Sequence, residues 1–217
     1  MKEGGTMPER RQNRRAAVSE RKREIILDAA RDVFAEEGLD GASLRAIAVR
    51  AGYTPAALYF HFDSKEALYA ALLHDSLGAL GRAVAAAVSQ AKGPEQELKA
   101  AAMAFFDFYA QNPRDLDLGF YLFRGGMKPA GLGQERDVTL NAALEAALRP
   151  IGDAAVTLGA SRARANLLMV DCFAHAAGLL LLLHTGRIRM FGASAGERMK
   201  AYVEERIDLL QVEEKAC

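Results

Sequence analysis

The sequence SLRAIAVRAGYTPAALYFHF predicts two short helices with room for only a tight turn between them. Ser43 can cap the first helix, in which apolar residues recur at helical spacing until Gly52. A single residue separates this glycine from Thr54, an N-cap residue that is followed by Pro55 at the favoured first helical position. The chain must therefore turn sharply and begin a second short helix at once.

Longer helical patterns lie on both sides of this pair. The preceding pattern is a stripe that Gly38 ends and that contains Ile25, Ile26, Ala29, Ala30, Val33 and Phe34. After the pair, Asp63 or Ser64 can cap a long Ala- and Leu-rich helix over about 65–90, and Glu66 stands at capping-box spacing from Asp63. Two short helices behind a longer one indicate a helix-turn-helix, whose second helix lies in the major groove of DNA.

Four aromatic residues follow one another at the end of the second short helix. Neighbouring side chains on a helix point about 100° apart, so the four rings cannot all be buried on one face. We expect Leu58 and Phe62, four residues apart, to face the core, and Phe60 to fill a junction between helices beside Phe62. Tyr59 and His61 are then free to donate hydrogen bonds to DNA phosphates.

These residues carry a family resemblance. REIILDAARDVFAEEGLDGASLRAIAVRAGYTPAALYFHFDSKEALYAAL resembles the DNA-binding domain of the tetracycline-repressor (TetR) family of bacterial transcriptional regulators over about fifty residues. The resemblance implies DNA-contacting positions at Arg45, Thr54, Pro55, Ala57, Tyr59, His61 and Lys65. The exposed recognition positions are Pro55, Ala56 and Ala57, which lack hydrogen-bonding side chains. Base reading is therefore expected to rely on thymine methyl groups, on Arg45 and on DNA shape.

Charge is uneven along the chain although the formal net charge is zero. Residues 1–23 contain eight bases and three acids, which leaves the remainder at minus five. We predict a disordered basic arm over 1–19, and the composition fits either a solvated tail or an arm that binds nucleic acid. The DNA-binding domain is expected over 20–66 and a second domain over 67–217.

The second domain is predicted to be helical throughout, with helices near 94–112, 134–150, 162–185 and 195–212. Its aromatic and Met residues fit an ordinary core by default. In the TetR family, however, this region encloses a cavity for a small effector. The resemblance therefore implies an effector pocket whose candidate residues are Phe105, Phe108, Tyr109, Tyr121, Met169, Phe173 and His175.

The last two predicted helices are expected to form a two-fold dimer, as they do in the family. The helix near 162–185 is apolar around much of its circumference, and the final helix carries a stripe that one small domain is not expected to bury fully. That stripe consists of Met199, Tyr202, Val203, Ile207 and Leu210. Asp171 and His175 lie near the centre of the most apolar run and favour a buried helix over a membrane span.

Two patterns in the sequence resemble parts of enzyme sites. The run GASAG, residues 192–196, fits G-x-S-x-G, but no histidine follows Ser194 in chain order, so a nucleophile elbow is not expected and Ser194 is interpreted as a helix-start residue. Asp171 and His175 share a helical face, yet two aligned ligands do not make a metal site. We expect no catalytic residue, no metal and no cofactor. With two dissimilar cysteines and no apparent secretory signal, a cytoplasmic location is expected.

The sequence therefore predicts an all-α regulator with an N-terminal three-helix helix-turn-helix domain and a helical ligand-binding and dimerisation domain. The expected partners are double-stranded palindromic operator DNA, a second copy of the chain and a small, largely apolar effector that releases a repressor; no membrane is expected. The alternative is a DNA-binding regulator without a small effector, whose second domain serves dimerisation or protein partners only.

Overall fold

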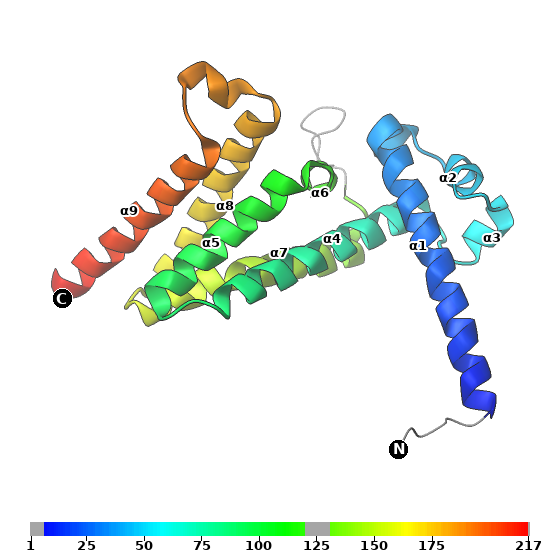
Figure 1. Cartoon of the computed structure of the whole chain (residues 1–217), viewed down its shortest axis with the longest axis horizontal. Helices are drawn as coiled ribbons and strands as arrows, with labels where there is room; N and C mark the ends of the chain where they lie inside the picture. The colour runs from blue at the N-terminus through cyan, green and yellow to red at the C-terminus, as the bar shows by residue number, and fades with distance from the viewer. Residues whose placement is uncertain (1–6, 120–130, 217) are drawn as a thin grey trace. The chain divides into compact units, whose positions relative to one another are not determined.

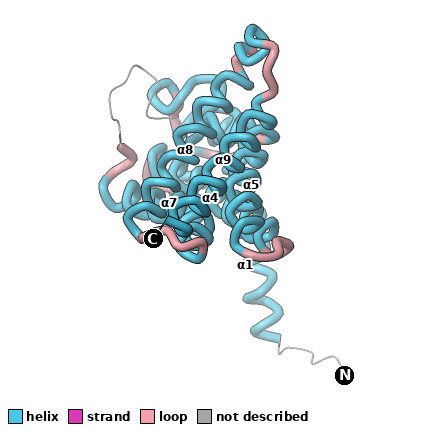
Figure 2. Tube along the Cα trace, turned by 90° about the vertical axis from the view of Figure 1, so that its left-hand side faces the viewer, coloured by secondary structure: helices cyan, strands magenta, loops and turns pink. Residues whose placement is uncertain are grey.

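A computed structural model describes residues 7–119 and 131–216, without the side chains of 7–10, 12, 13, 15, 16 and 212–216. All the regular secondary structure in these ranges is helical (Figures 1 and 2). The elements in chain order are α1 (Met7–Gly41), α2 (Leu44–Arg50), α3 (Pro55–Tyr59), α4 (Lys65–Val88), α5 (Pro94–Gln111), α6 (Pro113–Gly119), α7 (Gln134–Thr157), α8 (Arg162–His184), the 3₁₀ helix η2 (Arg187–Phe191) and α9 (Ala195–Ala216).

The chain forms two compact units, and the division falls within α4 after Leu72 rather than at the expected residue 66. The first unit holds α1, α2, α3 and the start of α4, together with residues 131–136. Its core is built from the predicted stripe of α1 and from α2 and α3, with Ile26, Ala30, Phe34, Ile47 and Leu58 almost fully buried. The ring of Phe34 meets that of Tyr69 from α4 edge to face, with centroids 4.9 Å apart.

The predicted disordered arm over 1–19 is wrong for the part that the structure describes. Helix α1 begins at Met7 and continues without a break into the core-forming stripe. Most of residues 7–19 favour or tolerate a helix. The only proline there, Pro8, lies in the first turn, where a backbone N–H would make no hydrogen bond within the helix. The composition that indicated disorder therefore belongs to a charged, solvent-exposed helix.

The second unit is a layered helical bundle in which α5, α8 and α9 pack against one another (Figures 1 and 2). Buried residues line the facing sides of all three helices, among them Leu98, Phe106, Leu168, Leu180 and Val203. The helix predicted over 134–150 extends to Thr157, because Pro150 sits inside α7 instead of ending it. The run RIRMF is a 3₁₀ helix bounded by Gly186 and Gly192, both with positive φ.

The expectation that a single domain leaves the α9 stripe partly open holds only at Tyr202. Met199, Val203, Ile207 and Leu210 are all buried, and only Tyr202 is half-buried. These residues pack within the unit, since α9 contacts both α5 and α8. The exposed large apolar residues of the unit include Leu167, Val170 and Leu181 on α8.

By length and composition alone, α4 and α8 are each apolar enough to cross a membrane. Helix α8 packs against α5 and α9 and buries Leu168, Cys172 and Leu180 between them. Its exposed side chains include Arg162, Arg164 and Asp171. One side of α8 is therefore buried in the bundle, and the other side is exposed.

Candidate nucleic-acid interface

Side-chain caps set the geometry of the two short helices. The Oγ atom of Ser43 accepts a hydrogen bond from the Ala46 N–H at 3.1 Å, and Oγ1 of Thr54 accepts one from the Ala57 N–H at 3.3 Å. Between the helices, Gly52 adopts a φ of 73°, a left-handed conformation that favours glycine. The predicted turn and both predicted caps are therefore confirmed.

The four consecutive aromatic residues at 59–62, here called the aromatic row, are buried or exposed largely as predicted. Leu58 is fully buried and Phe62 is 9% exposed, so both belong to the core of the first unit. Tyr59 is 59% exposed, and His61 is half-buried at the end of α3. The expectation that Phe60 fills a junction is wrong, because its ring is 87% exposed. Phe60 lies two residues beyond Leu58, on a side of the turn away from the core.

The remaining predicted DNA contacts come from three places. Arg45 and Thr54 are exposed, and Pro55 and Ala57 are half-buried on α3. The Lys65 Nζ atom donates a hydrogen bond at 3.1 Å to the backbone carbonyl of Asp40, which follows the non-helical Gly38 at the end of α1. Every one of these residues belongs to the first unit. Their contacts with DNA stay predictions.

An ion pair that sequence reasoning missed joins α2 to α1. The Arg50 guanidinium donates two hydrogen bonds to the Glu36 carboxylate, at 2.9 and 2.6 Å. The hydrogen bond from Arg50 holds the pKa of Glu36 below its usual value, and the same bond raises the pKa of Arg50. The two residues are 14 positions apart and both look like ordinary surface charges, so only the packing of α1 against α2 reveals the pair.

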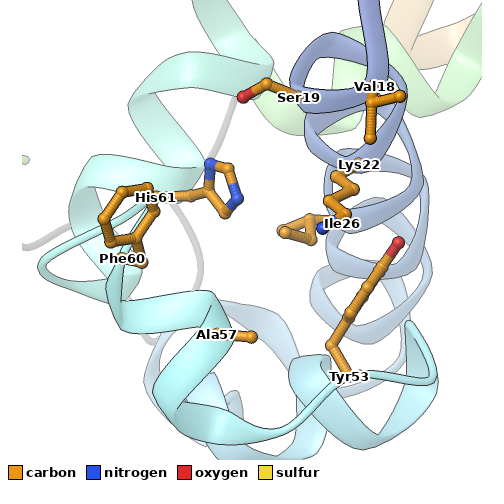
Figure 3. Close-up of a pocket in the computed structure, with 8 residues that line it drawn as sticks. All are labelled: Val18, Ser19, Lys22, Ile26, Tyr53, Ala57, Phe60 and His61. Carbon is orange, nitrogen blue, oxygen red and sulfur yellow. The ribbon is translucent and has the colours of Figure 1, made fainter. Parts of the chain in front are cut away.

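A groove of about 320 Å³ separates the N-terminal part of α1 from α3 (Figure 3). The His61 ring is directed toward α1, and Lys22 and Ile26 face it from α1. The complete lining consists of Val18, Ser19, Lys22, Ile26, Tyr53, Ala57, Phe60 and His61. Sequence reasoning missed this groove because residues up to 19 were predicted to be disordered.

The candidate effector residues lie in the second unit, apart from Tyr121, which falls outside the described residues. Rings from α5 and α8 form a chain of edge-to-face contacts, with centroid distances of 5.2 Å for Phe108–Tyr109, 5.3 Å for Phe105–Tyr109 and 5.8 Å for Phe105–Phe173. Burial raises the pKa of Tyr109 to about 12. The structure therefore brings four of the predicted residues together.

Two further candidates have separate surroundings. Met169 lies against Gly152 of α7, where an added Cβ would come within 2.5 Å of the Met169 Sδ atom. His175 stacks on Tyr202 of α9. Ser194, the serine of the G-x-S-x-G pattern, accepts a hydrogen bond from the Glu197 N–H at 3.3 Å and begins α9, as predicted. In the described part of the chain, no three His, Cys, Asp or Glu side chains are grouped to hold a metal ion.

A three-helix unit with a tight glycine turn between α2 and α3, joined to a larger helical bundle, defines the class of helix-turn-helix regulators. Residues 26–72 match the family described as "Bacterial regulatory proteins, tetR family". The match confirms, over this segment, the resemblance of the chain to the TetR family.

Curated relatives match through about half of their length. The chain is 36% identical over 110 residues to the HTH-type transcriptional activator FasR of Mycolicibacterium smegmatis, covering 51% of this chain and 50% of FasR. It is 31% identical over 107 residues to the HTH-type transcriptional repressor NicS of Pseudomonas putida, covering 49% and 50%. An activator and a repressor are thus both among its relatives.

Solved structures resemble the fold over most of the chain. A TetR family regulator from Marinobacter aquaeolei VT8 has a TM-score of 0.68 at 18% identity, covering 89% of this chain and 97% of that one. FadR from Bacillus subtilis, in complex with stearoyl-CoA, has a TM-score of 0.62 at 16% identity, covering 86% and 96%. At these identities the likeness establishes the fold alone.

Proposed function

We propose that the protein is a cytoplasmic, ligand-responsive transcriptional regulator, and specifically a repressor that binds a palindromic operator as a dimer. The observation that supports DNA binding is that the side chains of α3 and of the turn after it point to two different sides. Leu58 and Phe62 anchor the segment in the core, which leaves Tyr59 and His61 directed elsewhere. The proposed DNA contacts are Arg45, Thr54, Pro55, Ala57, Tyr59, His61 and Lys65.

We place the dimer interface on α8 and α9, with α8 supplying the apolar contact. Leu167, Val170 and Leu181 are exposed at separations of three and eleven residues, which brings them to one side of the helix. Ala174 and Gly178 lie between them on the same side and are also exposed. Their small side chains allow two copies of α8 to approach closely. A two-fold contact through this stripe would cover the same patch on both subunits.

A small, largely apolar effector is proposed to bind in the second unit beside the aromatic cluster of Phe105, Phe108, Tyr109 and Phe173. The ring contacts supply an apolar wall, beside which a few polar groups would fix the orientation of the effector. The FadR structure with stearoyl-CoA is a precedent within the fold for an effector with a long apolar part. The alternative retains DNA binding and dimerisation without an effector. The near-complete burial of Phe105 and Tyr109 favours this alternative, because it is what an ordinary hydrophobic core would show.

The test begins with selection of a binding duplex from a random-sequence library by the full-length protein. We expect enrichment of a palindrome and a dimeric protein in the complex. Acyl-CoA thioesters and free fatty acids are then titrated against the complex. Release of DNA supports the effector proposal, and linkage requires that saturating duplex lower effector affinity by the same factor. Failure of every apolar ligand to bind, with DNA binding intact, would favour the alternative.

A further inference from the structure

The groove between α1 and α3 combines polar groups with an apolar floor. Ser19, Lys22 and Ile26 lie on α1, and Ala57 and His61 lie on the opposite side of the groove (Figure 3). Ser19, Lys22 and Phe60 are exposed, so the groove is open along its rim. An open groove of this composition suits an extended chain that has both apolar and anionic groups. It suits a small ligand that must be enclosed less well.

Positive side chains on the groove face of α1 favour the binding of an anion. Arg11, Val18 and Lys22 are separated by seven and four residues, so all three share the face of α1 that lines the groove. Within the described part of the chain, Lys22 has no ion-pair partner. The nearby acids lie on other faces of the helix, where Glu24 pairs with Arg21 at 2.8 Å and Glu20 with Arg23 at 3.6 Å.

The groove is also continuous with the proposed DNA-binding surface. Its second wall is α3 and the residue His61, which already belongs to the set of proposed phosphate contacts. A DNA strand that passes His61 therefore passes the mouth of the groove. Lys22 and Ser19 then supply an ammonium and a hydroxyl group, both of which bind phosphate oxygens.

We propose that this groove is a second contact site for the DNA backbone, in which one phosphodiester group lies between Lys22 and His61 with its deoxyribose against the exposed ring of Phe60. The inference rests on the proposed DNA-binding function and adds α1 to the surface. Arg11 extends the contact along the same strand, toward the N-terminal end of α1. The site reads no base, so it strengthens binding to every sequence alike.

The test compares Lys22→Gln with Arg21→Gln in the full-length protein. Both changes remove one positive charge, but Arg21 faces away from the groove and is paired with Glu24. Affinity for a random-sequence duplex is measured by fluorescence anisotropy between about 50 and 200 mM salt. We expect Lys22→Gln to lower the slope of log affinity against log salt by about 0.9 for each protomer bound, and Lys22→Arg to restore it. Equal slopes for the two Gln variants would overturn the proposal and leave the proposed function standing.

A second measurement does not depend on charge. Ser19→Cys places a thiol in the groove, and Ala17→Cys places one at an exposed position on another face of α1. Alkylation of each thiol is followed by peptide mass spectrometry, which separates it from Cys172 and Cys217. We expect duplex DNA to slow alkylation at 19 several-fold and to leave position 17 unaffected. Equal protection at both positions contradicts the groove contact, and failure of the wild-type protein to bind any duplex contradicts both proposals.

Discussion

His175 of α8 and Tyr202 of α9 stack face to face, with ring centroids 3.9 Å apart and planes inclined by 14°. The guanidinium carbon of Arg206 lies 5.1 Å from the centroid of the same Tyr202 ring. Burial lowers the pKa of His175, opposed by a hydrogen bond to the Arg198 backbone and reinforced by the charges of Arg198 and Arg206. The stack therefore joins two helices that pack against each other, and its surroundings disfavour the protonated imidazole.

This contact makes stability depend on pH. Because the pKa of His175 is lowered on folding, the unfolded chain binds the proton more readily than the folded protein does. The stabilisation that His175 gives the folded state is fully present above its pKa in the unfolded chain, about 6.5. It is lost as the pH falls below this value toward the pKa in the folded protein. We expect His175→Gln to reduce the fall in Tm between about pH 7 and 5. The control is His74→Gln, at an exposed position on α4. Equal pH profiles for His175→Gln and the wild type would contradict this.

Phe60 and Phe62 offer a matched pair of aromatic truncations two residues apart. Phe62→Ala removes a buried ring from the first unit and is expected to cost roughly 3 to 5 kcal/mol of unfolding free energy. Phe60→Ala removes a ring that is almost fully exposed, so its cost should stay within about 0.5 kcal/mol. Urea unfolding measures both. If Phe60→Ala unfolds as readily as Phe62→Ala, the ring is not exposed in solution.

The helix-turn-helix could be predicted because its signals are local. Ser43, Gly52 and Thr54 each act within a few residues through a cap or a left-handed turn, and short-range rules describe such effects well. The burial of Leu58 and Phe62 follows in the same way from helical spacing. Phe60 could not be placed by these rules, because its exposure depends on where the chain turns after α3.

Features that depend on packing between distant segments escaped prediction. The Arg50–Glu36 ion pair spans 14 residues, and the burial of the α9 stripe depends on how α5 and α8 cover it. The groove required the N-terminal part of α1 to be a helix, whereas charge composition indicated disorder there. Composition indicates how much apolar surface a segment can bury. It does not predict that a charged segment stays helical when it continues from a helix that is already packed in a core.

Lys65 is expected to contribute in two ways. Lys65→Ala removes a proposed phosphate contact, so binding to selected and random duplexes should weaken alike, with the salt slope lower by about 0.9 per protomer. It also removes the hydrogen bond to the Asp40 carbonyl, at a cost on the order of 1 kcal/mol of unfolding free energy. Anisotropy and urea unfolding measure the two effects. A loss of affinity confined to the selected duplex would show that Lys65 reads sequence.

The dimer proposal is tested by two valines of nearly equal exposure. Val170 on α8 is 61% exposed and belongs to the proposed interface, whereas Val138 on α7 is 63% exposed and lies outside it. A charge at the centre of an apolar contact loses solvation without gaining a partner, so Val170→Glu should shift the protein toward monomers. Val138→Glu should remain dimeric. Light scattering over a range of protein concentrations measures the mass, and a dimeric Val170→Glu variant would place the interface elsewhere.

The exposed hydroxyl of Tyr59 gives the sharpest test of what the aromatic row contacts. Tyr59→Phe keeps the ring and removes only the group proposed to donate a hydrogen bond to a phosphate, at a cost of about 1 to 3 kcal/mol of binding free energy. Backbone contacts carry affinity without sequence information, so the loss should be similar on selected and random duplexes. Tyr202→Phe, in the second unit, serves as the control and should bind DNA like the wild type. Unchanged affinity with relaxed base preference in Tyr59→Phe would mean that this hydroxyl reads a base edge and faces the floor of the major groove.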